Sequence, residues 1–214
     1  MNEPLVSCIM PTANRQKYIP FAINHFLKQD YRHKELIIVD DGKDSIINLI
    51  PDDVRIKYFY TAPLGKIGVK RNYACERAEG KIIMHWDDDD YFAKDWITKQ
   101  VHFLLSSGAD ICGVEHVHFF SPVTDTFWVG TSLNRNNPNS ARKWLNGATL
   151  AYWKSFWAEH PFKDLQTGED DEFITKSGAN IFAHDYIDGF VALLHAHNTT
   201  VKYFEDPKHK LSII

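Results

Sequence analysis

The sequence predicts an α/β fold with an open, mostly parallel sheet flanked by helices. Short apolar runs alternate with amphipathic stretches through the first 115 residues, as strands alternate with helices in such folds. Three of the runs end in polar or acidic residues, namely Thr12–Arg15, Asp40-Asp41 and Asp87–Asp90. With 214 residues and a 44% hydrophobic composition, the chain can bury the core of one domain.

The first elements follow from their apolar patterns. Leu5–Met10 is a short uninterrupted apolar run, as a buried parallel strand is. Pro20 then stands in the first turn of a helix whose apolar face is spaced at helical intervals. Leu36–Val39 is a second buried-type strand, and a short helix near Ser45–Leu49 and a strand over Ile56–Tyr60 are expected after it.

The same alternation continues to residue 115. We expect a helix over Val69–Ala78, a strand over Lys81–Trp86, a helix over Trp96–Ser106 and a strand over Asp110–Val114. Gly80 is the expected stop of the first of these helices, because glycine is common just past a helix end. Asp95 is the expected N-cap of the second.

The pattern changes after residue 115. The elements expected there are a β-hairpin of His116–Phe120 and Thr126–Gly130, a polar loop over Asn134–Ser140, helices over Ala151–Ala158 and Asp170–Ser177, and a strand over Val191–His195. No repeat or low-complexity linker separates the two parts, so residues 1–214 are predicted to form a single domain with halves of about 1–115 and 116–214.

Composition excludes several classes of protein. The net charge of -4 gives no basic surface for a nucleic-acid backbone. No apolar run approaches the roughly 18 residues of a membrane span, and the N-terminus lacks the basic region of a signal peptide. Cys8, Cys75 and Cys112 are odd in number and widely spaced, which indicates reduced thiols in a cytoplasmic protein.

The acidic run Asp87–Asp90 is the most informative motif. Four adjacent carboxylates repel one another unless a cation offsets them, and oxygen ligands of this kind favour Mg²⁺ or Mn²⁺. The alternative is a solvated run of charges, which is common on protein surfaces. Because the run follows an apolar strand and lies between Trp86 and Tyr91, a metal site is the preferred interpretation.

Three further segments carry candidate site residues. In the segment Gly65–Gly80, Lys66, Lys70 and Arg71 could hold a diphosphate, or could form the wet face of a helix. The acids that follow Thr167-Gly168 could be catalytic, or could complement the dipole of a helix. His195 and His197 end an apolar strand and could be metal ligands or structural residues.

From about Val6 to about Thr200, the sequence resembles the GT-A-fold glycosyltransferases of family 2. The resemblance is carried by the order of its motifs, which are PTANR, VDDG, a basic helix that contains RN, HWDDDD, GEDDEF and HAHNTT. The resemblance implies a Rossmann-like half that binds a nucleotide sugar and a second half that binds an acceptor. It also implies an inverting enzyme that uses a nucleoside-diphosphate sugar, usually UDP-linked, with Mn²⁺ or Mg²⁺.

The resemblance also implies roles for particular residues. Those implied to bind the donor are Thr12, Asn14, Arg15, Asp40, Asp41, Asp87 and Asp88, and Lys66, Lys70 and Arg71 are expected to face its diphosphate. Asp89 is expected to be the principal metal ligand, with help from Asp87 and from His197 or His195, His197 being slightly favoured. Asp170, the second acid of an ED pair, is expected to be the catalytic base.

Two departures and two rival functions remain. Ala13 stands where the family often has a tyrosine, and the fourth acid, Asp90, leaves the register of the metal-binding motif open. A nucleotidyltransferase is one rival, although the loop after the first strand has no glycine. An inactive carbohydrate-binding relative is the other. The expected partners are a UDP-sugar and a glycan or lipid-linked glycan acceptor in cell-surface polysaccharide synthesis, with peripheral binding at the inner membrane face left open.

Overall fold

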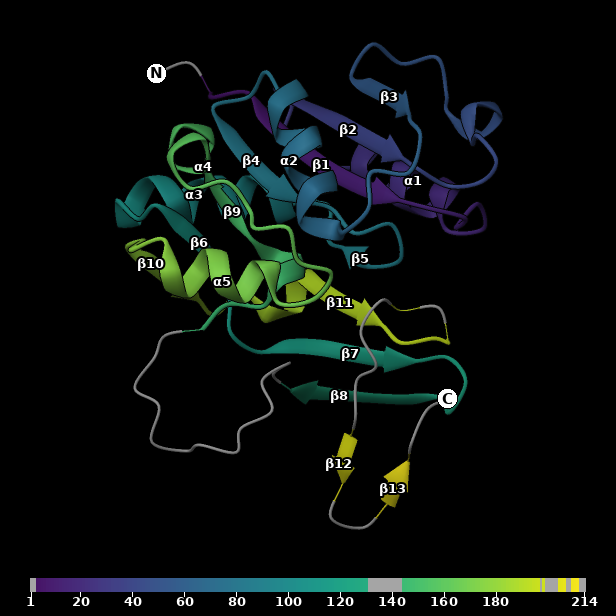
Figure 1. Cartoon of the computed structure of the whole chain (residues 1–214). Helices are drawn as coiled ribbons and strands as arrows, with labels where there is room; N and C mark the ends of the chain where they lie inside the picture. The colour runs from purple at the N-terminus through teal and green to yellow at the C-terminus, as the bar shows by residue number, and fades with distance from the viewer. Residues whose placement is uncertain (1–2, 131–143, 197, 199–203, 207–208, 212–214) are drawn as a thin grey trace.

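The computed structural model describes residues 3–130, 144–196, 198, 204–206 and 209–211. Its centre is a seven-stranded sheet with the strand order β10-β6-β9-β4-β1-β2-β3 (Figure 1). The strands are β1 (Val6–Thr12), β2 (Lys34–Asp40), β3 (Ile56–Tyr60), β4 (Ile82–His85), β6 (Ile111–Val114), β9 (Ala151–Trp153) and β10 (Ile181–His184). β1 pairs in parallel with β2 and β4, and β9 runs antiparallel between β4 and β6, so the sheet is mixed and mostly parallel.

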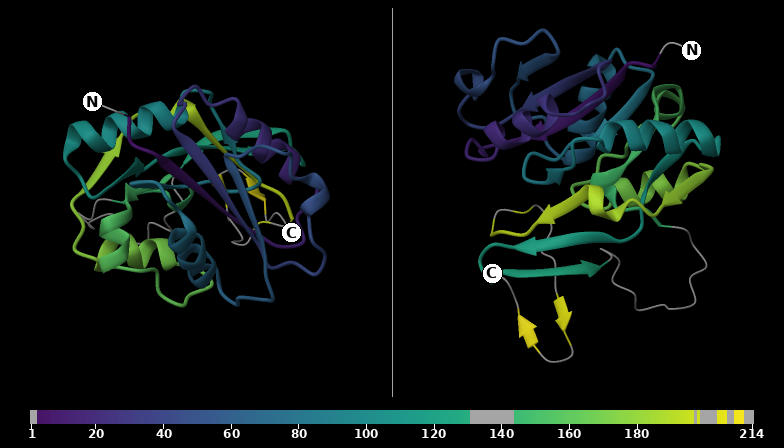
Figure 2. Two further views of the ribbon diagram at one scale, coloured as in Figure 1. Left: turned by 90° about the horizontal axis from the view of Figure 1, so that it is seen from above. Right: turned by 180° about the vertical axis from the view of Figure 1, so that it is seen from behind.

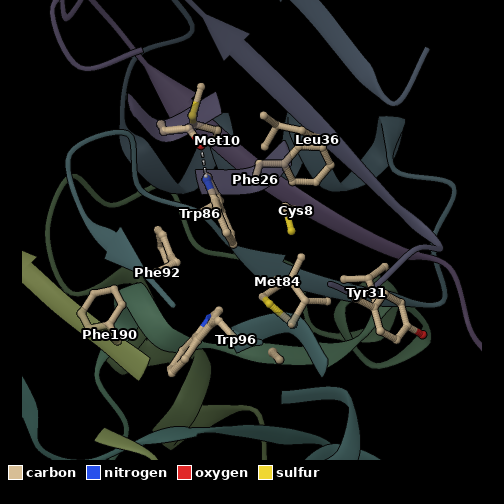
Figure 3. Packing of buried hydrophobic residues seen from close by; sticks show 14 of the residues in the cluster. Cys8, Met10, Phe26, Tyr31, Leu36, Met84, Trp86, Phe92, Trp96 and Phe190 are labelled. Atoms are coloured by element: carbon tan, nitrogen blue, oxygen red, sulfur yellow. Dashed lines mark hydrogen bonds between the residues drawn. The ribbon is translucent and has the colours of Figure 1, made fainter. Parts of the chain in front are cut away.

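Helices cover both faces of this sheet, as predicted (Figure 2). They are α1 (Ile19–Leu27), α2 (Ile67–Arg77), α3 (Trp96–Ser107), α4 (Lys154–Glu159) and α5 (Glu169–Lys176). The pleat of β1 divides the core, because Cys8 and Met10 pack with α1 and α3 while Ile9 packs with α2, α4 and α5. The first of these layers is rich in aromatic rings, among them Phe26, Trp86 and Trp96 (Figure 3).

A second, smaller sheet lies beside the first (Figure 1). Its order is β5-β11-β7-β8, formed by β5 (Tyr91–Phe92), β11 (Phe190–Leu193), β7 (Val117–Ser121) and β8 (Thr126–Gly130). β7 and β8 form the predicted hairpin. A separate antiparallel pair joins β12 (Phe204–Asp206) to β13 (His209–Leu211), and short 3₁₀ turns span Ile47–Leu49, Gly147–Thr149 and Ile187–Gly189.

Several predicted elements differ from the structure. The prediction of a helix over Ala151–Ala158 is wrong for its first three residues. These form β9, which pairs with strands on both sides, and α4 begins only at Lys154. The strand β10 was not predicted. Asp95 makes no side-chain cap; its carboxylate instead accepts a hydrogen bond from the Tyr186 hydroxyl at 2.5 Å. The polar loop expected over Asn134–Ser140 lies outside the described residues.

The three cysteine thiols are buried and free, and burial raises the pKa of Cys75 to about 12. Such thiols stay protonated near neutral pH and behave as small apolar side chains. Within the part of the chain that the structure describes, no helix is both long and apolar enough to cross a membrane.

Because of its buried His184, the protein is expected to lose stability in mild acid. Its ring is buried and stacks on Phe103 with centroids 4.3 Å apart, and burial lowers its pKa from 6.5 to about 4. Because the unfolded chain binds the proton more tightly, the stabilisation is complete above about pH 6.5 and is lost as the pH falls toward 4. A shift of this size corresponds to about 3 kcal/mol.

Urea denaturation at pH 7 and pH 4.5 measures this effect. We expect the unfolding free energy of the wild-type chain to fall by about 2–3 kcal/mol more than that of His184→Phe. His102→Gln, a change at an exposed position of α3, is the matched control and should behave as wild type. An equal fall in all three proteins would contradict the assignment to His184.

Candidate active site

The carboxyl ends of β1, β2 and β4 meet at one edge of the sheet, where ligands bind in open α/β folds. A cavity of about 720 Å³ lies there, and its lining includes Thr12, Asn14, Arg15, Lys70 and Asn198. A second cavity of about 580 Å³ shares Asn14 with the first. Its other lining residues are Asp41, Gly42, Lys43, Tyr60, Thr61, Ala62 and Pro63.

The acidic run is held firmly at both ends by buried aromatic residues. Trp86 and Phe92 stack on each other with ring centroids 3.9 Å apart, and the Trp86 indole N–H donates to the carbonyl of Ala22 at 3.2 Å (Figure 3). Asp88, Asp89 and Asp90 are each less than a tenth exposed. The run is therefore not a solvated stretch of surface charge.

Asp88 and Asp89 meet residues that the sequence analysis assigned to the same site. The Thr12 hydroxyl donates to Asp88 at 2.6 Å, and the Arg15 guanidinium forms ion pairs with both carboxylates. His195 Nε2 lies 2.9 Å from Asp89 Oδ2, and its ring stacks on Tyr18 at 4.5 Å.

Their environments give these two acids different proton affinities. Burial raises the pKa of Asp88 to about 7, against the opposing charge of Arg15. Burial also opposes ionisation of Asp89, but the hydrogen bond with His195 and the charge of Arg15 outweigh it and lower the pKa of this carboxyl. Asp89 is therefore the carboxylate in this pair that stays ionised at neutral pH.

The outer members of the run point elsewhere. The side chain of Asp87 is 30% exposed and lies 3.7 Å from the Arg71 guanidinium. Asp90 accepts a hydrogen bond from the backbone N–H of Leu193 at 3.0 Å, which ties the run to β11. Because the Asp90 carboxylate bonds to the backbone of the second sheet, Asp87 and Asp89 are the better candidates for the metal-binding motif, whose register the sequence leaves open.

The two acids after β2 also differ. Asp40 is fully buried, and its carboxylate accepts hydrogen bonds from the Gly42 N–H at 2.9 Å and the Tyr58 hydroxyl at 2.8 Å. Asp41 lines the smaller cavity, pairs with Lys70 and accepts from the Leu64 N–H at 3.1 Å. Asp40 thus holds the turn that presents Asp41.

The three basic residues of the glycine-rich segment occupy different places. Lys70 lines the larger cavity, whereas the Lys66 side chain is 53% exposed and lies near Asp164. Arg71 is buried and donates to Glu169 Oε1 at 3.1 Å. Its charge lies between the acidic run and the first turn of α5.

The acids at the start of α5 face different neighbours. Glu169 is buried against Arg71, and burial raises its pKa. Asp170 is partly buried; its Oδ1 accepts from the Asp171 N–H at 2.8 Å, and its other oxygen lies against Gly147. The hydrogen bond to Asp171 is a helix-end contact, so a helix-stabilising role accompanies any chemical one.

The side chains of His195 and Asn198 both contact the Asp89 carboxylate. The Asn198 amide donates to Asp89 Oδ2 at 3.1 Å, a contact that was not predicted although Asn198 lies in the HAHNTT segment. The expected ligand His197 lies outside the described residues. Among the residues that are described, no three histidine, cysteine or acidic side chains surround a common metal position, and Arg15 lies against Asp88 and Asp89.

The main sheet, whose strand β4 runs into the acidic loop, and the second sheet beside it together have the architecture of the GT-A fold. Residues 7–163 match the family model "Glycosyl transferase family 2", and the chain belongs to that family.

Relatives and solved structures agree with this assignment. The putative teichuronic acid biosynthesis glycosyltransferase TuaG of Bacillus subtilis is 36% identical over 108 residues, which are 48% of this chain and 43% of TuaG. S. aureus TarS (residues 1–349) in complex with UDP-GlcNAc has a TM-score of 0.72 at 23% identity, over 91% of this chain and 60% of that one. The mannosyltransferase PcManGT of Pyrobaculum calidifontis with GDP-Man and Mn²⁺ has a TM-score of 0.69 at 18% identity, over 91% and 57%. The chain spans less than half the length of the curated relatives it matches first.

Proposed function

We propose that the chain is an inverting glycosyltransferase that moves a sugar from a nucleoside-diphosphate sugar, most simply a UDP-sugar, to a hydroxyl of a glycan or lipid-linked glycan acceptor. The observation that carries this proposal is the convergence of Asp41, Arg15 and Asp89 at the strand ends, beside the acids of α5. The complex of TarS with UDP-GlcNAc supports a UDP-linked donor, and the putative role of TuaG in teichuronic acid biosynthesis supports a place in cell-surface polysaccharide synthesis.

The two cavities suggest how the donor lies. The nucleoside occupies the smaller cavity, where Asn14 and Asp41 offer hydrogen-bond partners to base and ribose. The diphosphate extends into the larger cavity, toward Lys70 and Arg15. Thr12 and Asp40 hold the loops around it through their bonds to Asp88 and Gly42. Positive charge on the two basic side chains complements the phosphates.

The residues present fit a divalent metal in their chemistry. Carboxylate oxygens of Asp87 and Asp89 with one imidazole, from His195 or His197, are ligand types that Mn²⁺ and Mg²⁺ accept, and PcManGT with Mn²⁺ supports the choice. When bound, the ion would offset negative charge on the departing diphosphate. In the structure Arg15 forms ion pairs with Asp88 and Asp89, and its positive charge offsets theirs.

Asp170 acts as the general base in this proposal. It takes the proton of the acceptor hydroxyl as that oxygen attacks the anomeric carbon, opposite the bond to the diphosphate. The carbon–oxygen bond to the acceptor forms, the bond to the diphosphate breaks, and the configuration at the carbon inverts. The Arg71 guanidinium lies close enough to interact with Asp87, Glu169 and Asp170, so a fixed positive charge stands between the acidic run and the proposed base.

Replacing Asp41 by alanine tests the donor site. We expect UDP affinity to fall by about 1–3 kcal/mol, or roughly 5- to 150-fold, because a buried hydrogen-bonding partner of the nucleoside is lost. Calorimetric titration with UDP and Mn²⁺ measures the change. Asp52→Ala, at an exposed position before β3, is the matched control. Unchanged UDP affinity in Asp41→Ala would rule out this placement of the nucleoside.

A further inference from the structure

Gly147 lies so close to the carboxylate of Asp170 that a side chain on residue 147 would force this carboxylate to move. A Cβ atom on residue 147 would overlap Asp170 Oδ2 and lie 2.5 Å from its Cγ, whereas real Cβ contacts essentially never fall under 3.0 Å. Gly147 is not among the glycines with positive φ, so its backbone conformation is open to alanine. The need for glycine at this position therefore comes from the Asp170 side chain.

His85 fixes the carbonyl of the same glycine. Its imidazole is fully buried at the end of β4, and Nδ1 lies 2.5 Å from the Gly147 oxygen. A carbonyl only accepts hydrogen bonds, so Nδ1 carries the proton and Nε2 accepts, at 3.3 Å, from the hydroxyl of Tyr152 on the neighbouring β9. This imidazole has no place in the donor site described above.

The turn around Gly147 is fixed on its other side as well. The Asn146 side chain accepts from the Ala148 N–H at 3.1 Å, and the Thr149 hydroxyl donates to the Asn146 carbonyl at 2.7 Å. The turn therefore has little freedom to move away from Asp170. Its position is set by β4, the strand that runs directly into the acidic run.

We propose that Gly147 and His85 are positioning residues for the catalytic base. His85 holds the turn that contains Gly147, and the absence of a side chain on Gly147 lets the Asp170 carboxylate adopt its orientation. This inference rests on the proposed function, because it takes Asp170 to be the base. Since His85 and the acidic run both stand at the end of β4, one strand sets the distance between the base and the donor-side acids.

Gly147→Ala is the first test. Two of the three nearest atoms to an added Cβ are Oδ2 and Cγ of Asp170, which rotation about χ1 moves away; the third, Asp170 Cβ at 2.9 Å, needs only a small shift, so the fold and UDP affinity should change little. Turnover should fall by at least about 100-fold, as for loss of the base itself. Turnover is measured as UDP release, with water as the acceptor of the sugar, from whichever of UDP-glucose, UDP-galactose, UDP-N-acetylglucosamine and UDP-N-acetylgalactosamine the wild-type chain uses fastest. Gly130→Ala, whose Cβ would meet nothing closer than 3.4 Å, is the matched control.

A double-mutant cycle separates positioning from a general structural role. If Gly147 acts through Asp170, Gly147→Ala should cost almost nothing further in an Asp170→Asn background. A loss that multiplies in the double mutant would overturn the proposal. Wild-type turnover in Asp170→Asn would instead refute the assignment of the base, whereas loss in Asp170→Asn with full turnover in Gly147→Ala would refute the positioning role alone.

A pair of His85 variants tests the same idea without changing the glycine. An asparagine amide can donate from the position of Nδ1, whereas a glutamine amide reaches the position of Nε2. We therefore expect His85→Asn to keep more of the wild-type kcat than His85→Gln, with similar UDP affinity in both. Equal kcat in the two folded variants would contradict the role assigned to the hydrogen bond with Gly147.

Discussion

Replacing Asp170 by asparagine is expected to lower turnover by about 10²–10⁴-fold, the usual contribution of a general base. Asparagine has nearly the same size and keeps an oxygen that can accept from the Asp171 N–H, so the first turn of α5 should stay intact. UDP affinity and Tm should therefore remain close to those of the wild-type chain. If these acids only stabilised the helix, turnover would be nearly unchanged.

UDP release from a UDP-sugar, followed together with Tm and UDP titration, measures the effect of Asp170→Asn. Asp171→Asn is the matched control, because Asp171 is exposed on the same turn. Glu169→Gln should lower stability as well as turnover, since Glu169 is buried in an ion pair with Arg71. Wild-type turnover in Asp170→Asn combined with a large loss in Asp171→Asn would move the base to the neighbour. Full activity in all three variants would exclude base catalysis from α5.

Replacing Asp89 by alanine is expected to abolish the increase in UDP affinity that Mn²⁺ produces, a loss of at least about 100-fold in the presence of the ion. Of Asp88 and Asp89, Asp89 is the acid with the lowered pKa, and His195 and Asn198 both contact it. Outer partners of a ligand typically contribute 10- to 100-fold in metal affinity, so loss of the principal ligand should cost at least as much.

Calorimetric titrations of Asp89→Ala with UDP, in MnCl₂ and in EDTA, test this expectation. Glu76→Ala removes an exposed acid from α2 and serves as the control for net charge. His195→Ala should show a milder loss, because water can replace one ligand among several. An undiminished Mn²⁺ effect in Asp89→Ala would place the ion elsewhere and would show that the assigned register is wrong.

The strands that carry the site were predictable because their sequences are nearly continuous apolar runs. β1, β2 and β4 are buried on both faces, and the central positions of such strands are mostly apolar. β9 gave no comparable signal, since its three residues run into α4 without a turn residue between them. β10 was missed for a related reason: two of its four residues are exposed, so it lacks a full apolar run.

The site residues that lie at the ends of strands could be predicted from the sequence. Thr12, Arg15 and Asp41 follow strands that the sequence identifies, and parallel strands bring their ends together. The bonds between Asp90 and Leu193 and between Arg71 and Glu169 join residues 103 and 98 positions apart. No local pattern encodes such pairs, because they depend on how the second sheet and α5 pack against the first sheet.

The central claim is that the strand-end cavities hold a nucleoside diphosphate beside the acidic run. Calorimetric titration of the chain with UDP, GDP, dTDP and CMP, each with and without Mn²⁺, tests it most directly. We expect saturable binding of UDP at a single site, stronger with Mn²⁺ than without it, and weaker binding of the other nucleotides. Absence of binding by every one of these nucleotides, with and without the ion, would contradict it.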